Sequence, residues 1–152
     1  MSSLTLQQLI PVIQTAVGPV ILISGVGLLL LSMTNRFGRI VDRSRLLARE
    51  LPQAGVPERD QLAVQLAILY RRARILRLAI ILATASVLLA GLLIMSLFLA
   101  ALLHVEGALV VAICFILCMA ALIGSLGVFL LDLQVSLTAL RVELDQAGFK
   151  GE

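Results

Sequence analysis

The chain has 152 residues, of which 61% are hydrophobic and 14% are charged, and its formal net charge is +3. With a mean hydropathy of +1.10, it has more apolar surface than one small water-soluble core could enclose. These values exclude an ordinary soluble domain, and we expect lipid to be the solvent for much of the chain.

Three long runs contain no charged side chain. The first precedes Arg36, and the other two cover 28 residues at 78–105 and 25 residues at 107–131. A helix needs only about 20 residues to cross a hydrocarbon core of about 30 Å. We therefore expect three transmembrane helices, at about 15–33, 78–103 and 107–131.

The N-terminal segment lacks the features of a signal peptide, because residues 1–15 contain no Lys or Arg and no small-residue cleavage site follows the apolar run. We expect the first helix to stay in the mature protein. The role of residues 1–14 is open. Leu6, Leu9, Ile10 and Ile13 form a helical apolar stripe, so this segment either lies along the outer interface or lengthens the first span.

One face of the first helix differs from the others because it is small or polar at most levels. At alternating steps of three and four it carries Gly18, Ile21, Gly25, Leu28, Ser32, Asn35, Arg39 and Asp42. If the protein forms a pore, we expect this stripe to line it, with an apolar gate at Ile21 or Leu28. The alternative is that the stripe packs against the second span, because small residues at intervals of seven also permit close helix contact.

The segment between the first two spans is rich in arginine. Ten of the twelve basic residues lie in it: Arg36, Arg39, Arg43, Arg45, Arg49, Arg59, Arg71, Arg72, Arg74 and Arg77. Short loops rich in Lys and Arg stay in the cytoplasm, so we expect the N-terminus outside and the C-terminus inside. We attribute the arginines to topology and to contact with anionic lipid at the cytoplasmic face, and not to nucleic-acid binding.

The cytoplasmic part is predicted to be helical and continuous with the spans. Two prolines and a glycine in 51–57 mark a turn, which makes 34–77 a helical hairpin. From Leu62 through Ala101, apolar residues alternate steps of four and three in a heptad seam. The pattern continues in a C-terminal helix at about 132–147, where Leu133, Leu137, Leu140 and Leu144 share one stripe. We therefore expect one membrane domain, residues 1–152, whose helices extend into a cytoplasmic bundle.

Two features suggest how the helices pack. Counted from Val105 in the outer hairpin, Arg77 and Asp132 reach the same depth, and we predict that they form a structural ion pair. Small residues are frequent in the last two spans: Ala79, Ala83, Ser86, Ala90, Ala120, Ala121, Gly124, Ser125 and Gly127. Helices in lipid associate through such residues, and three helices cannot cover them all, so we expect a cyclic homo-oligomer.

Catalytic chemistry has little support. His104 has no partner at nucleophile or metal spacing, and we expect it to mark the outer hairpin. Cys114 and Cys118 are one helical turn apart, which disfavours a mutual disulfide, and buried cysteines usually serve as small apolar residues. We predict no enzyme activity, no cofactor and no metal site.

The chain resembles a known family at this point. The stretch from Gly18 to Gly25, the string Asn-Arg-x-Gly-Arg-Ile-x-Asp-Arg at 35–43 and the basic residues at 71–74 are similar to a family of small bacterial membrane proteins known only as domain of unknown function 2721. The likeness covers nearly the whole chain. It implies a bacterial inner membrane and a shared architecture, and it supplies neither an activity nor site residues.

Two function classes remain. We favour an ion channel or pore lined by the first helix, with small ions as its cargo, because this span is more polar and glycine-containing than the others and has an uninterrupted polar stripe at its inner end. The alternative is a non-conducting membrane scaffold or regulatory protein that acts through its cytoplasmic helices. A transporter is less favoured, since transporters usually display internal repeats and none is evident here.

Overall fold

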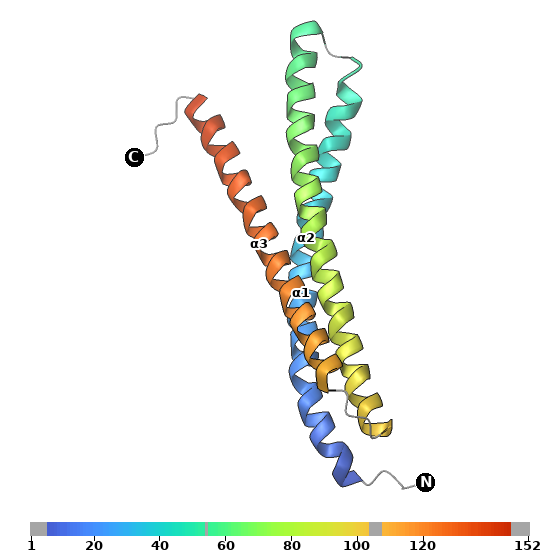
Figure 1. The fold of residues 1–152 in the computed structure, drawn as a ribbon. Coiled ribbons are helices and arrows are strands. Elements are labelled where there is room, and N and C mark those ends of the chain that lie inside the picture. Colours follow the sequence, from blue (N-terminus) through green and yellow to red (C-terminus); the bar gives the residue numbers. More distant parts are fainter. Residues whose placement is uncertain (1–5, 54, 104–107, 147–152) are drawn as a thin grey trace. The chain divides into compact units, whose positions relative to one another are not determined.

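The computed structural model contains three long helices, α1 (Leu6–Glu50), α2 (Val56–Leu103) and α3 (Ala108–Gln146) (Figure 1). It describes the backbone of residues 6–53, 55–103 and 108–146, and the side chains of 10–53, 55–103 and 108–135. Each helix is long and apolar enough to cross a membrane. The prediction of an all-α chain with three spans is confirmed at this level. The segment predicted to form the outer hairpin, with His104, Val105 and Glu106, lies outside the described residues.

Helix α1 begins well before the predicted span. It is continuous over 45 residues and contains Pro11 and Pro19, so the N-terminal segment lengthens the first helix. Proline lacks an amide hydrogen, and membrane helices tolerate it where neighbouring groups compensate. The hydroxyl of Thr15 donates a hydrogen bond of 2.8 Å to the Pro11 carbonyl, and that of Ser24 donates one of 3.3 Å to the Val20 carbonyl. Both hydroxyls therefore bond to a carbonyl one turn earlier in the same helix, a pattern common for Ser and Thr in membrane helices.

The turn between α1 and α2 lies where prolines and glycine predicted it. The amide of Leu51 donates to the Leu47 carbonyl at 3.0 Å, and that of Gln53 donates to the Glu50 carbonyl at 3.0 Å. Pro57 is the second residue of α2, where no amide donor is needed, and Glu58 follows in the first turn. An acidic side chain at this position complements the positive end of the helix dipole.

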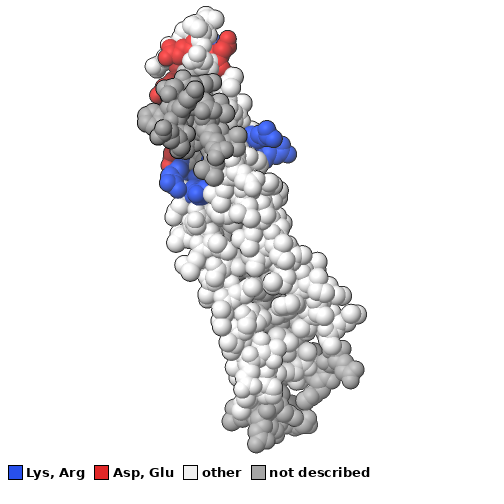
Figure 2. Space-filling view, turned by 90° about the vertical axis from the view of Figure 1, so that its left-hand side faces the viewer, with Lys and Arg blue, Asp and Glu red and all other residues white. Residues whose placement is uncertain are grey.

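The helices divide between two compact units. The first comprises residues 1–32 and 81–124, and the second comprises 33–80 and 125–152. The described residues of the first unit include no charged side chain, so every charged residue that the structure describes belongs to the second unit. On the face drawn in Figure 2, the blue and red charged side chains gather over one part of the surface, and a long stretch of white surface carries none. The first unit therefore has the composition expected of a region surrounded by hydrocarbon.

The core of the first unit is built from small residues of α2. Ala83, Ser86 and Ala90 are at most 1% exposed, and Cys118 of α3 is 3% exposed. The Cys118 thiol donates a hydrogen bond of 3.3 Å to the Ser86 carbonyl. Its sulfur also lies 3.5 Å from the Ser86 hydroxyl oxygen. The small α2 side chains allow α3 to approach the backbone, as expected for helices packed in lipid.

The core of the second unit follows the same rule. Ala79 is fully buried, and its carbonyl accepts a hydrogen bond of 2.7 Å from the hydroxyl of Ser125, which is also fully buried. Met33 and Ile40 of α1 pack into this unit with 1% and 7% of their surface exposed. The four small α2 residues predicted to form a helix contact are therefore all buried inside one chain, and they cannot also form a contact between subunits.

The space around Gly124 shows how closely α3 packs against α2. A Cβ atom added at this glycine would lie 3.6 Å from Cδ1 of Leu82, an ordinary van der Waals distance. Alanine also favours a helix over glycine by about 0.8–1 kcal/mol. We expect Gly124→Ala to leave thermal stability in detergent unchanged or raised. A loss of several degrees in melting temperature would show that α2 and α3 pack more closely than the structure has them.

Candidate functional site

The α1 stripe lies on the side of the helix that points away from the rest of the chain. All eight of its residues are exposed, including Ile21 at 66% and Leu28 at 72%. The opposite face holds the buried residues of α1: Ala16, Val26, Met33 and Ile40. A helix with 3.6 residues per turn separates these two sets onto different faces. Helix α1 therefore packs with one face and leaves its small and polar face uncovered.

This exposure bears on the interpretation in which the glycines of the stripe pack against the second helix. A Cβ atom added at Gly18 or Gly25 would meet no atom within 4 Å. Ser32, the third member of the seven-residue spacing, is exposed as well. The interpretation that the stripe packs against the second helix of the same chain is wrong. What covers this face, whether water, lipid or another copy of the chain, must come from outside the subunit.

The polar end of the stripe crosses from one unit to the other along a single helix. Ser32 is the last α1 residue of the first unit, while Asn35, Arg39 and Asp42 belong to the second. All four side chains are exposed. Arg36, at the edge of the stripe, is half-buried, and its guanidinium carbon lies 5.6 Å from the centre of the Phe129 ring in a cation–π contact. Arg36 therefore packs against α3, whereas Arg39 is exposed.

A buried ion pair joins α2 and α3 in the second unit. Asp132 is 1% exposed, and its Oδ1 lies 3.8 Å from Nε of Arg72, whose side chain is 22% exposed. The sequence predicted Arg77 as the partner of Asp132. Arg77 is exposed and lines a cavity that is described below.

The helix face explains why Arg72 reaches Asp132. The most buried stripe of α2 passes through Leu76, Ala79 and Ala83, and Arg72 precedes Leu76 by one turn on that stripe. Arg77 follows Leu76 directly, so it is rotated by about 100° from the stripe. The depth count used for the prediction fixed a level in the membrane but no face. Extending the small-residue stripe back from Ala79 by seven residues, through Leu76, would have selected Arg72.

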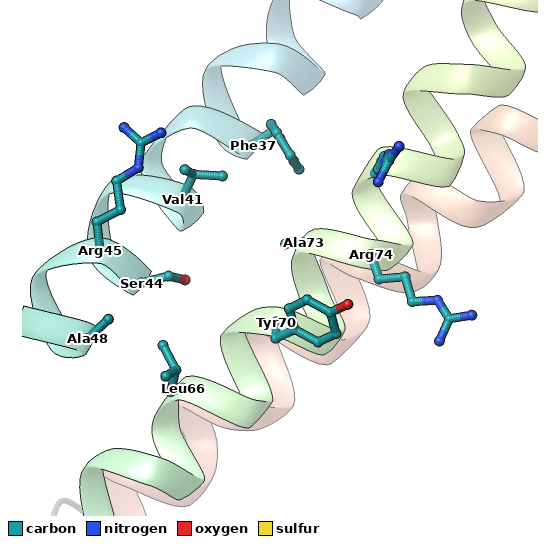
Figure 3. A pocket seen from close by; sticks show the side chains of 10 residues that line it. Phe37, Val41, Ser44, Arg45, Ala48, Leu66, Tyr70, Ala73 and Arg74 are labelled. Atoms are coloured by element: carbon teal, nitrogen blue, oxygen red, sulfur yellow. The ribbon is translucent and has the colours of Figure 1, made fainter. Parts of the chain in front are cut away.

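A cavity of about 460 Å³ lies in the second unit between α1 and α2. Its lining residues are Phe37, Val41, Ser44, Arg45, Ala48, Leu66, Tyr70, Ala73, Arg74 and Arg77. Figure 3 shows Phe37, Val41 and Leu66 pointing into the gap between the two helices. The Arg45 and Arg74 side chains extend away from this apolar floor (Figure 3). The site therefore has an apolar floor and guanidinium groups at its rim, and sequence patterns gave no sign of it.

Among the described residues, no group of three or more His, Cys, Asp or Glu side chains lies close enough to hold a metal ion. Cys114 and Cys118 are free, and the contacts of Cys118 with Ser86 give it a packing role. The exposed α1 stripe and the arginine-rimmed cavity are the two features that remain as candidate sites.

The sequence profile of a protein family described as "Protein of unknown function (DUF2721)" matches residues 16–142. This range covers most of the chain and includes the α1 stripe, the cavity and the buried ion pair. It agrees with the family that the sequence resembles. No curated protein and no solved structure matches the chain.

Proposed function

We propose that this chain, which belongs to the family of unknown function named above, assembles as a cyclic homo-oligomer whose first helix lines an ion-conducting pore. Family membership adds no activity to this argument. The proposal is supported by the composition and exposure of one helix face in a protein with three apolar helices long enough to cross a membrane.

The observation that carries the proposal is the uncovered polar face of α1. Ser32 and Asn35 are exposed at the end of a helix stretch without charged residues. Polar side chains in a span usually face water or a bundle interior, because transferring an unpaired amide or hydroxyl from water to hydrocarbon costs about 4–8 kcal/mol. A ring of subunits that turns this face inward gives both side chains access to water.

Cyclic assembly also accounts for the glycines of the stripe. Gly18 and Gly25 are exposed on the same face as Ser32, and no side chain of the subunit approaches them. Small residues on a face allow neighbouring α1 helices to approach one another around an axis. Closed rings are the usual way for identical patches to be covered without leaving a free end.

The order of apolar, polar and charged side chains along the stripe suits ion conduction. Ile21 and Leu28 are its large apolar members, and rings of such side chains close a narrow pore by excluding water. Ser32 and Asn35 would form polar rings beyond this gate. Arg39 and Asp42 would place charges of both signs at one mouth of the pore, so ions would meet a hydrated vestibule before the apolar constriction.

The distribution of arginines supports one orientation. The segment from Arg36 to Arg77 holds ten of the twelve basic residues, which favours the cytoplasm for this segment and the outside for the N-terminus. The C-terminus would then lie inside the cell. We place the protein in a bacterial inner membrane, with anionic lipid around its cytoplasmic arginines.

Reconstitution tests the proposal. Purified full-length protein in liposomes should have the mass of an oligomer and should release trapped ions. We expect Leu28→Asn to raise the rate of ion release about tenfold, because it removes an apolar ring whose dewetting barrier need only fall by about 1.4 kcal/mol for that change. Leu31→Asn is the matched control, since Leu31 is 59% exposed beside the stripe and off it.

Measurements of mass and ion release can also contradict the proposal. If the protein is monomeric, or if neither the natural chain nor Leu28→Asn conducts ions, the pore proposal fails. An equal rise in ion release with Leu31→Asn would mean that the substitution disturbs the bilayer and opens no defined path.

One observation favours the alternative function, a non-conducting scaffold or regulator. The first half of α2 exposes large apolar side chains, with Val56 at 82%, Val64 at 61% and Tyr70 at 73%. Such residues on the arginine-rich part of the chain could receive another protein. An oligomer that never conducts would support this alternative.

A further inference from the structure

We propose that the arginine-rimmed cavity between α1 and α2 is a binding site for an anionic phospholipid. This inference is independent of the pore, because it concerns the opposite side of α1. Val41, Ser44 and Ala48 line the cavity, whereas the pore stripe at this level consists of Arg39 and Asp42.

The cavity has the size and composition of a site for an amphiphile. Its volume of about 460 Å³ is within the usual range for small-molecule pockets, which is about 300–1,000 Å³. The floor is apolar or aromatic, with Phe37 and Tyr70 from opposite helices. A ligand that fills it must therefore present an apolar part together with groups that suit the rim.

The charge of the rim selects an anion. Arg45, Arg74 and Arg77 line the cavity, and no acidic residue does. None of these three arginines forms a salt bridge with a residue whose side chain the structure describes. Guanidinium groups bind phosphate through charge-assisted and often bidentate hydrogen bonds.

The position along the helices selects a lipid over a soluble phosphate compound. Phe37 follows the last α1 residue of the charge-free unit by five positions, and Arg77 precedes its first α2 residue by four. At 1.5 Å per residue these steps span about 6–8 Å along each helix. The head-group layer on each side of a bilayer has a similar thickness of about 5–8 Å.

The cavity lining matches the parts of a lipid. Phe37, which lines the end nearer the charge-free unit, would contact the first carbons of the acyl chains. Arg77 and Arg74 would turn toward the phosphate, and Tyr70, farther from that unit along α2, would lie beside the polar head group. Basic pockets between membrane helices at the cytoplasmic side bind anionic head groups by the same combination of charge and depth.

The experiment uses the absence of tryptophan from this chain. Phe37→Trp places a single indole in the cavity, and its fluorescence is measured in vesicles of phosphatidylcholine with a small fraction of brominated lipid. We expect brominated phosphatidylglycerol to quench this indole more strongly than brominated phosphatidylcholine at the same fraction. Leu88→Trp, at a residue of the charge-free unit that is 65% exposed, should be quenched equally by both lipids.

Charge-matched variants distinguish a site from general attraction. In the Phe37→Trp background, Arg74→Gln with Arg77→Gln should lower the preference for phosphatidylglycerol roughly thirtyfold, given the usual effect of two arginines at a membrane surface. Arg43→Gln with Arg49→Gln removes the same charge from exposed residues outside the cavity and should retain the preference. The Leu88→Trp reporter, carried through both double variants, shows that each is folded and inserted.

Three results would overturn the proposal. The first is equal quenching of the cavity indole by the two lipids. The second is an equal loss of preference in both double variants, which would assign it to net charge. The third is displacement of phosphatidylglycerol by inorganic phosphate or glycerol phosphate at millimolar concentration, which would assign the cavity to a soluble anion.

Discussion

Replacing Asp132 with leucine should prevent the accumulation of folded protein. Asp132 is 1% exposed and lies 3.8 Å from the Arg72 guanidinium. Removal of one partner leaves the other charge partly buried without its counter-charge, and such losses cost about 3–5 kcal/mol. Typical domains have a total stability of about 5–15 kcal/mol, so much of the folding free energy would be lost. The measurement is the yield of monodisperse protein and its melting temperature in detergent.

Two further variants separate the ion pair from simple loss of charge. Asp42→Asn removes an exposed carboxylate from the same unit and should change stability by less than about 0.5 kcal/mol. Arg72→Met combined with Asp132→Leu should recover much of the yield, since replacing both partners leaves no unpaired charge. If Asp132→Leu alone changed the yield and melting temperature as little as Asp42→Asn, the ion pair would not contribute to stability.

Replacing Ala79 with leucine should be the most disruptive change in the contact between α2 and α3. Ala79 has no exposed surface, and the Ser125 hydroxyl lies 2.7 Å from its carbonyl oxygen. The three added carbon atoms can fit only if the helices separate, which would also break this hydrogen bond. Overpacking of a tight core costs about 1–3 kcal/mol, and we expect the upper part of that range, seen as a fall in melting temperature.

Ala120→Leu provides the matched control, because Ala120 is exposed on α3 of the same protein. The same added volume there should leave the melting temperature nearly unchanged. An equal loss of stability at both positions would mean that the α2–α3 contact involves a different face of α3.

The helices could be predicted from the sequence, because a helix that crosses lipid needs a long run without charged residues. Long charge-free runs identified three spans, and the prolines and glycine at 51–57 located the turn between α1 and α2. The extent of α1 was left open, because the apolar stripe of Leu6, Leu9, Ile10 and Ile13 fits both an interfacial helix and a longer first span. The structure shows one continuous helix from Leu6.

Packing partners were predicted less well, because depth and composition do not show which face of a helix a residue lies on. The small α2 residues were assigned correctly to a helix contact because four of them share one face. On α3, small residues are frequent all round the helix, and composition could not show that Ser125 is buried while Ala120 and Gly127 are exposed. The prediction of Arg77 as the partner of Asp132 used depth alone, whereas the helix face places Arg72 beside Asp132.

The cavity was not predicted because a seam pattern implies close packing. Leu66 and Ala73 belong to the heptad seam of α2, and the sequence gives no sign that a gap remains between them and α1. The predicted stripe of the C-terminal helix stays a prediction, since the side chains of Leu137, Leu140 and Leu144 lie outside the described residues. The predicted cytoplasmic location and the homo-oligomer likewise await direct measurement.

Thiol labelling at three consecutive residues of α1 tests the central claim most directly. Leu31 is 59% exposed beside the stripe, Ser32 is exposed on it, and Met33 is 1% exposed on the packed face. Each is replaced by cysteine in a chain that lacks Cys114 and Cys118 and is treated in liposomes with a charged, water-soluble thiol reagent. Depth is nearly constant among the three, so reactivity reports which face meets water.

We predict that only Ser32→Cys reacts, and that its modification lowers the ion flux, because the stripe faces an aqueous pore while lipid or protein covers the other two positions. Protection of Ser32→Cys under conditions in which Arg39→Cys reacts would contradict the account. So would reaction of Ser32→Cys without any change in flux.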